Sequence, residues 1–71
     1  MTKDDVYKVM EEHKEDIYIV GDGNQSFYFT DRTKALRFAR RVGSKDIVMW
    51  DHHFYYDSFY WNPDTECFYY P

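Results

Sequence analysis

The chain has 71 residues and a formal net charge of −4, and its single cysteine is Cys67. A chain of this length makes one small domain, residues 1–71, and a single cysteine excludes an intramolecular disulfide. No apolar run reaches the roughly 20 residues that a membrane span needs, and the N-terminus lacks the basic and apolar regions of a signal peptide. We therefore expect a soluble domain in the reducing cytoplasm, without a membrane partner.

The charge is unevenly distributed along the chain. From Asp31 to Lys45 six basic residues accompany one acidic residue, so this segment carries +5 while the remainder carries −9. A net negative charge makes the whole chain a poor candidate for nucleic-acid binding, yet this segment has the charge that such binding requires.

The first segment, which begins at Thr2, predicts an amphipathic helix. Thr2 can accept a hydrogen bond from an early backbone N–H, and Asp4 and Asp5 follow where the helix dipole favours acidic side chains. Apolar residues recur at helical spacing from Val6 to Met10, with acidic residues opposite. We expect this helix to pack by its apolar side and to expose an acidic side.

Two short strands are expected next, at residues 16–20 and 26–30, where apolar and aromatic residues alternate with others. Residues 21–25 include two glycines that tolerate positive φ, so they predict a loop of about five residues in an antiparallel hairpin. If alternate residues of both strands face the core, Tyr18 and Tyr28 share the other face.

The segment after Asp31 predicts the best-defined helix of the chain. Asp31 can cap its start, and Gly43 can end it in the left-handed conformation that glycine adopts readily. Apolar residues gather on one side of this helix. The other side carries four basic residues, which we call the basic stripe: Lys34, Arg37, Arg40 and Arg41.

Three further strands are expected toward the C-terminus. Residues 46–50 form the first, and an aromatic hairpin follows with strands at 54–61 and 66–70. Between them, residues 62–65 (Asn-Pro-Asp-Thr) combine a side-chain acceptor with a proline of fixed φ, which is typical of a reverse turn.

The predicted order of elements is therefore α-β-β-α-β-β-β. Because helices and strands do not alternate strictly and neighbouring strands are joined by hairpins, we expect an α+β fold with a mostly antiparallel sheet of about five strands. Both helices are expected to pack on one face of this sheet, which leaves the other face open.

Sixteen aromatic residues, ten of them between positions 50 and 70, are too many for the core of so small a domain. Exposed aromatic patches mark interaction sites, so we expect an aromatic patch on the open sheet face that binds another protein. Its expected members are Tyr56, Tyr60, Trp61, Tyr18 and Tyr28. Two alternatives stay open: the rings only stabilise a thin sheet, or the same face joins two copies in a homodimer.

The basic stripe admits two functions and a simpler alternative. It can contribute charge complementarity to an acidic protein partner, or it can contact phosphates of a nucleic acid. The expected fold disfavours nucleic acid, because it places the stripe and the aromatic patch on opposite sides of the sheet. The simpler alternative is a solvated helix face that pairs with nearby acids.

No catalytic, cofactor or metal motif is recognisable. His52 and His53 are adjacent in the sequence, and adjacent side chains of a strand point to opposite faces, which disfavours a shared zinc ion. Cys67 has no neighbouring cation in the sequence that would favour a thiolate, so we expect a buried, inert thiol. We therefore expect a protein that is not an enzyme and that holds no metal or cofactor.

The compactness, acidity and aromatic content are similar to those of small phage or mobile-element proteins that act by binding a host protein, although no motif carries this similarity. The sequence favours a small non-enzymatic protein-binding domain that uses the aromatic patch. Nucleic-acid binding by the basic stripe is the alternative function.

Overall fold

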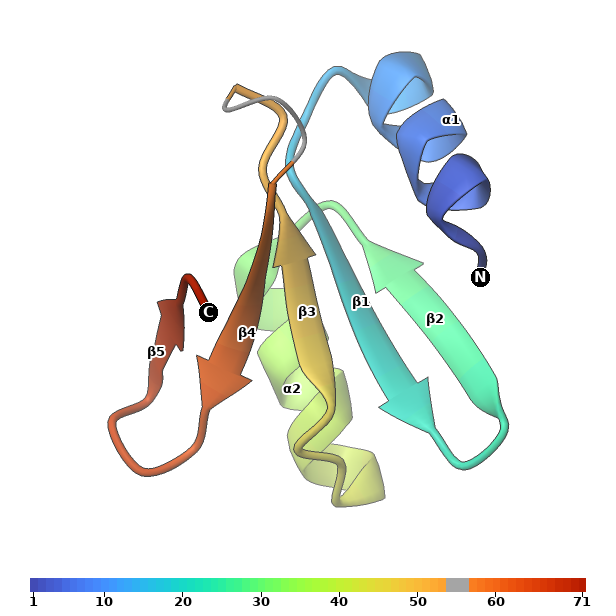
Figure 1. Cartoon of the computed structure of the whole chain (residues 1–71). Helices are drawn as coiled ribbons and strands as arrows, with labels where there is room; N and C mark the ends of the chain where they lie inside the picture. Colours follow the sequence, from blue (N-terminus) through green and yellow to red (C-terminus); the bar gives the residue numbers. More distant parts are fainter. Residues whose placement is uncertain (54–56) are drawn as a thin grey trace.

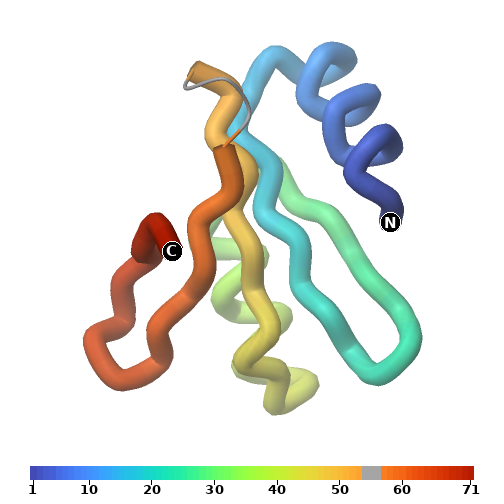
Figure 2. The backbone as a smooth tube through the Cα atoms, viewed as in Figure 1, coloured from blue at the N-terminus to red at the C-terminus, as the bar shows by residue number. Residues whose placement is uncertain are grey.

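The structure is a computed structural model that describes residues 1–53 and 57–71. Over these residues the chain forms helices α1 (Lys3–His13) and α2 (Arg32–Val42) and strands β1 (Ile17–Asp22), β2 (Gln25–Phe29), β3 (Ile47–Trp50), β4 (Ser58–Asn62) and β5 (Cys67–Tyr69). The strands form one antiparallel sheet in the order β2-β1-β3-β4-β5 (Figure 1, Figure 2). The predicted α+β class and order of elements are confirmed.

The helices pack on opposite faces of the sheet, so the prediction that both lie on one face is wrong. Ile17 of β1 is buried against Met10 of α1, whereas Val20 of β1 is buried against Ala39 of α2. Successive side chains of a strand point to opposite faces, and Ile17 and Val20 are three positions apart. Figure 1 shows α2 behind the sheet, where it overlaps β3 in this view. We call the two sides of the sheet the α1 face and the α2 face.

Cross-strand pairing extends both faces over the whole sheet. The α2 face carries apolar and aromatic side chains that pack with α2, namely Val20, Phe29, Ile47, Trp61 and Phe68. On the α1 face the paired positions form one row across all strands: Tyr28, Ile19, Val48, Tyr60 and Tyr69. The β4–β5 hairpin therefore presents different side chains on its two faces.

The start of α1 and both ends of α2 lie where the sequence predicts them. The backbone N–H of Asp5 donates to the Thr2 hydroxyl at 3.2 Å, and the backbone N–H of Thr2 donates to the Asp5 carboxylate at 3.1 Å. This reciprocal capping box satisfies backbone donors that the first turn of α1 would leave unpaired. Asp31 caps α2 by accepting from the Thr33 N–H at 2.9 Å, and Gly43 ends α2 at a φ of 71°.

The hairpins differ in detail from the prediction. Asp22 pairs with Gln25, so the β1–β2 turn is shorter than the expected loop and consists of residues 23 and 24. Asn62 begins the β4–β5 turn as predicted, because its side-chain oxygen accepts from the Asp64 N–H at 2.9 Å. The strand predicted from residue 54 is observed from Ser58, and residues 54–56 lie outside the described part of the chain.

Candidate partner-binding surfaces

The five residues predicted to form one aromatic patch do not come together. Tyr60 and Trp61 are neighbours in β4, so their side chains point to opposite faces of the sheet. Tyr60 and Tyr28 lie on the α1 face, while Trp61 and Tyr18 pack on the α2 face. Tyr56 lies outside the described residues. The expected patch is divided because alternation along β4 separates Tyr60 from Trp61. The β1–β2 register also pairs Tyr28 with Ile19, so the expectation that Tyr18 and Tyr28 share a face is wrong.

Two exposed tyrosines pair on the α1 face of the β4–β5 hairpin. Tyr60 and Tyr69 are directly opposite in the register, their ring centroids are 6.2 Å apart, and they are 40% and 49% exposed. Figure 1 shows α1 at the β2 side of the sheet, away from this hairpin. Tyr28 is also exposed, but its ring lies against His13 at the end of α1, with a centroid distance of 6.0 Å. We therefore restrict the name tyrosine surface to Tyr60 and Tyr69.

Tyr18 is a core-lining residue rather than an exposed anchor. Its half-buried ring lies 5.8 Å from the Phe68 ring, measured between centroids. Burial raises the pKa of the Tyr18 hydroxyl, and the Asp16 carboxylate raises it further. This side chain contributes to packing under α2 and not to a free surface.

The basic stripe is exposed along its whole length, as predicted, but its residues flank α2 on two sides. Lys34, Arg37 and Arg41 border a shallow depression beside Phe29 of β2 and the aromatic ring of Phe38. Arg40 lies on the opposite flank, toward the β4–β5 hairpin. Packing of α2 on the sheet thus separates Arg40 from the other members of the stripe.

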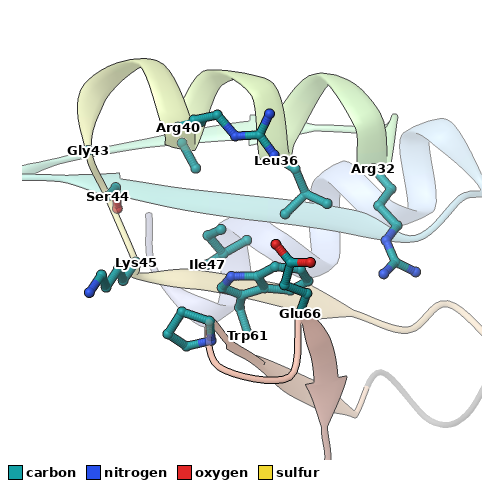
Figure 3. Close-up of a pocket in the computed structure, with 11 residues that line it drawn as sticks. Arg32, Leu36, Arg40, Gly43, Ser44, Lys45, Ile47, Trp61 and Glu66 are labelled. Carbon is teal, nitrogen blue, oxygen red and sulfur yellow. The ribbon is translucent and has the colours of Figure 1, made fainter.

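A groove of about 550 Å³ lies between α2 and the β4–β5 hairpin (Figure 3). Leu36 of α2 points toward Ile47 and Trp61 of the sheet, and these apolar side chains line its interior. Charged side chains also line it, from α2, from the segment after α2 and from the hairpin turn. These are Arg32, Arg40, Lys45 and Glu66, and we call the whole feature the basic groove.

The electrostatics of the molecule follow the division into faces. Helix α1 contains two lysines and four acidic residues, which give −2, whereas α2 contains five cations, which give +5. Within residues 1–53 and 57–71 the structure has one salt bridge, which joins Lys14 to Glu11. Among these residues the cations of the basic groove therefore form no ion pair with a carboxylate. The Arg32 guanidinium instead lies 5.3 Å from the centroid of the Phe68 ring.

Three charged residues of the groove were not predicted as site residues, namely Arg32, Lys45 and Glu66. Arg32, Leu36 and Arg40 recur every four positions, and this spacing places them along one flank of a helix. That signal could have grouped Arg32 with Arg40. Lys45 and Glu66 carry no such local signal, because strand order alone brings the β4–β5 turn next to the end of α2.

Cys67 and the adjacent histidines His52 and His53 belong to neither the tyrosine surface nor the basic groove. Cys67 is exposed, so the expectation of a buried thiol is wrong. The reason is that β5 is an edge strand and Cys67 pairs with Asn62 on the α1 face, away from the cluster under α2. The His52 and His53 rings lie 5.4 Å apart, and the described residues contain no group of three or more side chains placed to hold a metal ion.

In the part of the chain that the structure describes, neither helix has the length and apolar character needed to cross a membrane. Comparisons of the chain with protein-family models, with curated proteins and with solved structures gave no match in any of the three. The tyrosine surface and the basic groove are therefore the candidate partner-binding surfaces of this domain.

Proposed function

We propose that this chain is a small, non-enzymatic protein-binding domain that contacts its partner through the tyrosine surface. The observation that carries the proposal is the pairing of Tyr60 with Tyr69 on the α1 face, where both rings are exposed. Tyrosine combines a large apolar ring with a hydroxyl that keeps a hydrogen bond to water until a partner replaces it. Such residues supply much of the binding energy in protein interfaces.

The competing account is purely structural. A cross-strand aromatic pair stabilises a sheet by about 0.2–1 kcal/mol, whether or not anything binds to it. On that account, loss of the pair would lower stability slightly and change no binding affinity. An affinity measurement therefore separates the two explanations. Loss of the pair lowers the affinity for a partner if the tyrosines bind it, and leaves the affinity unchanged if they only stabilise the sheet.

We further propose a cytoplasmic protein as the partner. The composition similar to small phage proteins favours a host protein, while a second copy of this chain is the other partner that the same surface would fit. A homodimer would place the tyrosine pair of one copy against that of the next, as a twofold interface requires. Sedimentation equilibrium of the purified domain separates these two cases.

The experiment is a comparison of the double variant Tyr60→Thr and Tyr69→Thr with the control Tyr28→Thr. Tyr28 is 44% exposed and lies on the same face, but on β2 at the far edge of the sheet. Proteins retained by the immobilised domain are identified, and the affinity of the purified partner is then measured by calorimetry. We expect the double variant to bind at least about tenfold more weakly and the control to bind normally. Unchanged affinity of a folded double variant would refute the proposal.

Nucleic-acid binding by the basic stripe is the second candidate function. It gains support from the shared position of Arg40 and Trp61 in the basic groove, because a cation beside an aromatic ring is common in single-strand binding sites. Lys34, Arg37 and Arg41 would then contact phosphates from the other flank of α2. Phosphate contacts displace counterions, so affinity for an oligonucleotide would fall steeply with added salt. A salt-independent affinity, or none, would exclude this function.

A further inference from the structure

Three cations surround the basic groove. Arg32 and Arg40 lie along one flank of α2, and Lys45 follows the end of that helix. In residues 1–53 and 57–71 none of the three forms a salt bridge, and with the Glu66 carboxylate the groove carries +2 on a chain of net charge −4. A locally positive groove on a negative molecule favours an anionic ligand of short length, because a long polyanion would also meet the repulsion of the remaining acidic surface.

The interior of the same groove is apolar. Leu36 and Ile47 line it together with Trp61, whose ring is fixed by an edge contact with Phe68 at a centroid distance of 5.1 Å. The volume lies within the range of about 300–1,000 Å³ in which pockets enclose compact ligands. A ligand that fits must therefore carry both negative charge and an apolar group.

We infer that the basic groove binds an acidic peptide segment of a partner protein, with one apolar side chain of that segment seated against Trp61. Carboxylates spaced along the peptide pair with Arg32, Arg40 and Lys45. The groove lies on the α2 face and the tyrosine surface on the α1 face, so binding at one can fail while binding at the other persists.

Two features favour a peptide over a nucleic acid. Glu66 points from the hairpin turn toward α2 (Figure 3), and its carboxylate would repel a continuous row of phosphates. The carboxyl end of α2, which carries the partial negative charge of the helix dipole, also borders the groove at Gly43. A peptide can leave a neutral residue or a cation at these two positions, whereas a phosphate backbone cannot.

The test uses a blocked synthetic peptide in which one leucine is flanked on both sides by aspartate and glutamate. The peptide is titrated into the isotopically labelled domain at about 0.15 M salt, where exposed charges are screened over about 8 Å. We expect saturable shifts of the Trp61 indole N–H and of Arg40. A second peptide with serine in place of leucine should bind about tenfold more weakly, because the apolar anchor is lost.

Matched charge reversals locate the site. Arg40→Glu and Arg37→Glu change the net charge equally, both side chains are exposed, and they lie on opposite flanks of α2. We expect Arg40→Glu to lower the affinity for the leucine peptide about tenfold, and Arg37→Glu to change that affinity less than about twofold. Tyr60→Thr with Tyr69→Thr should leave peptide binding unchanged. The spectrum of each variant verifies that it is folded.

Three results would overturn the inference. The first is the absence of saturable shifts at Trp61 with the leucine peptide. The second is equal weakening by Arg40→Glu and Arg37→Glu, which would mean diffuse attraction by α2 rather than a site. The third is tighter binding of an oligothymidylate of matched charge at the same resonances, which would assign the groove to nucleic acid.

Discussion

Truncation of Met10 to alanine tests how α1 is held against the sheet. Met10 is 0% exposed and packs with Val6 and Ile17 in a cluster separate from the one under α2. Loss of a buried methionine costs about 2–5 kcal/mol, and less where neighbours can move into the cavity. The half-buried Tyr7 and Trp50 border this cluster and can move partly into the cavity. We therefore expect the free energy of unfolding to fall by about 3 kcal/mol.

That loss is a large fraction of the about 3–5 kcal/mol that a core in so small a domain supplies. Urea unfolding followed by circular dichroism measures the change in the free energy of unfolding. Val9→Ala is the control, because Val9 lies on the same helix and is half-buried, so its truncation should cost about 1 kcal/mol. A loss for Met10→Ala no greater than that for Val9→Ala would refute the packing of α1 by this side.

Three further predictions concern pH and backbone conformation. The backbone and side-chain hydrogen bonds of Thr2 lower the pKa of Asp5 below its ordinary value of 3.8, so its stabilising contribution is complete above that value and is lost as pH falls through the lowered pKa. As the pH is lowered through this range, the melting temperature of Asp5→Asn should therefore fall less than that of the unsubstituted protein. Burial raises the pKa of Tyr18 above its ordinary value of 10.0, so its contribution is complete below pH 10.0 and is lost as pH rises through the raised pKa. Tyr18→Phe should unfold less readily in an alkaline titration, and an unchanged profile would contradict the burial of the hydroxyl. Glu66 has a φ of 55°, so Glu66→Gly should stabilise the domain by about 0.5 kcal/mol and, by removing a carboxylate from the basic groove, tighten acidic-peptide binding. Glu66→Gln should tighten binding of the acidic peptide without raising the stability of the domain. A lower melting temperature for Glu66→Gly would refute backbone strain at this position.

Local signals in the sequence were sufficient to predict the order of the elements. The capping residues Thr2 and Asp31, the terminating Gly43 and the turn at Asn62 each act through hydrogen bonds or backbone angles of near neighbours. Such interactions depend little on the rest of the fold. They therefore mark helix ends and hairpins even when tertiary contacts are unknown.

The assignment of faces depended on contacts that are distant in sequence. β1 carries Ile17 and Ile19 on one face and Tyr18 and Val20 on the other, so its sequence suits burial on both faces. The prediction treated one of these faces as open. In the structure α1 covers the first and α2 the second, so Tyr18 packs under α2 and does not lie on an open face.

The candidate sites were predictable only in part for the same reason. A helical wheel identified Arg40 as exposed, but the flank of α2 that faces the β4–β5 hairpin follows from the strand order. Likewise, Tyr60 and Trp61 were both expected in one interface, although alternation along β4 separates them. The tyrosine surface and the basic groove therefore appear only when the faces are known.

Nuclear Overhauser contacts between methyl groups test the division into two faces most directly. In a methyl-labelled sample we predict contacts between Met10 and Ile17 and between Ala39 and Val20, with no contact between Met10 and Val20. These would place the tyrosine surface and the basic groove on opposite sides of the sheet. Contacts of both Met10 and Ala39 with Ile17 would put the helices on one face and contradict the account.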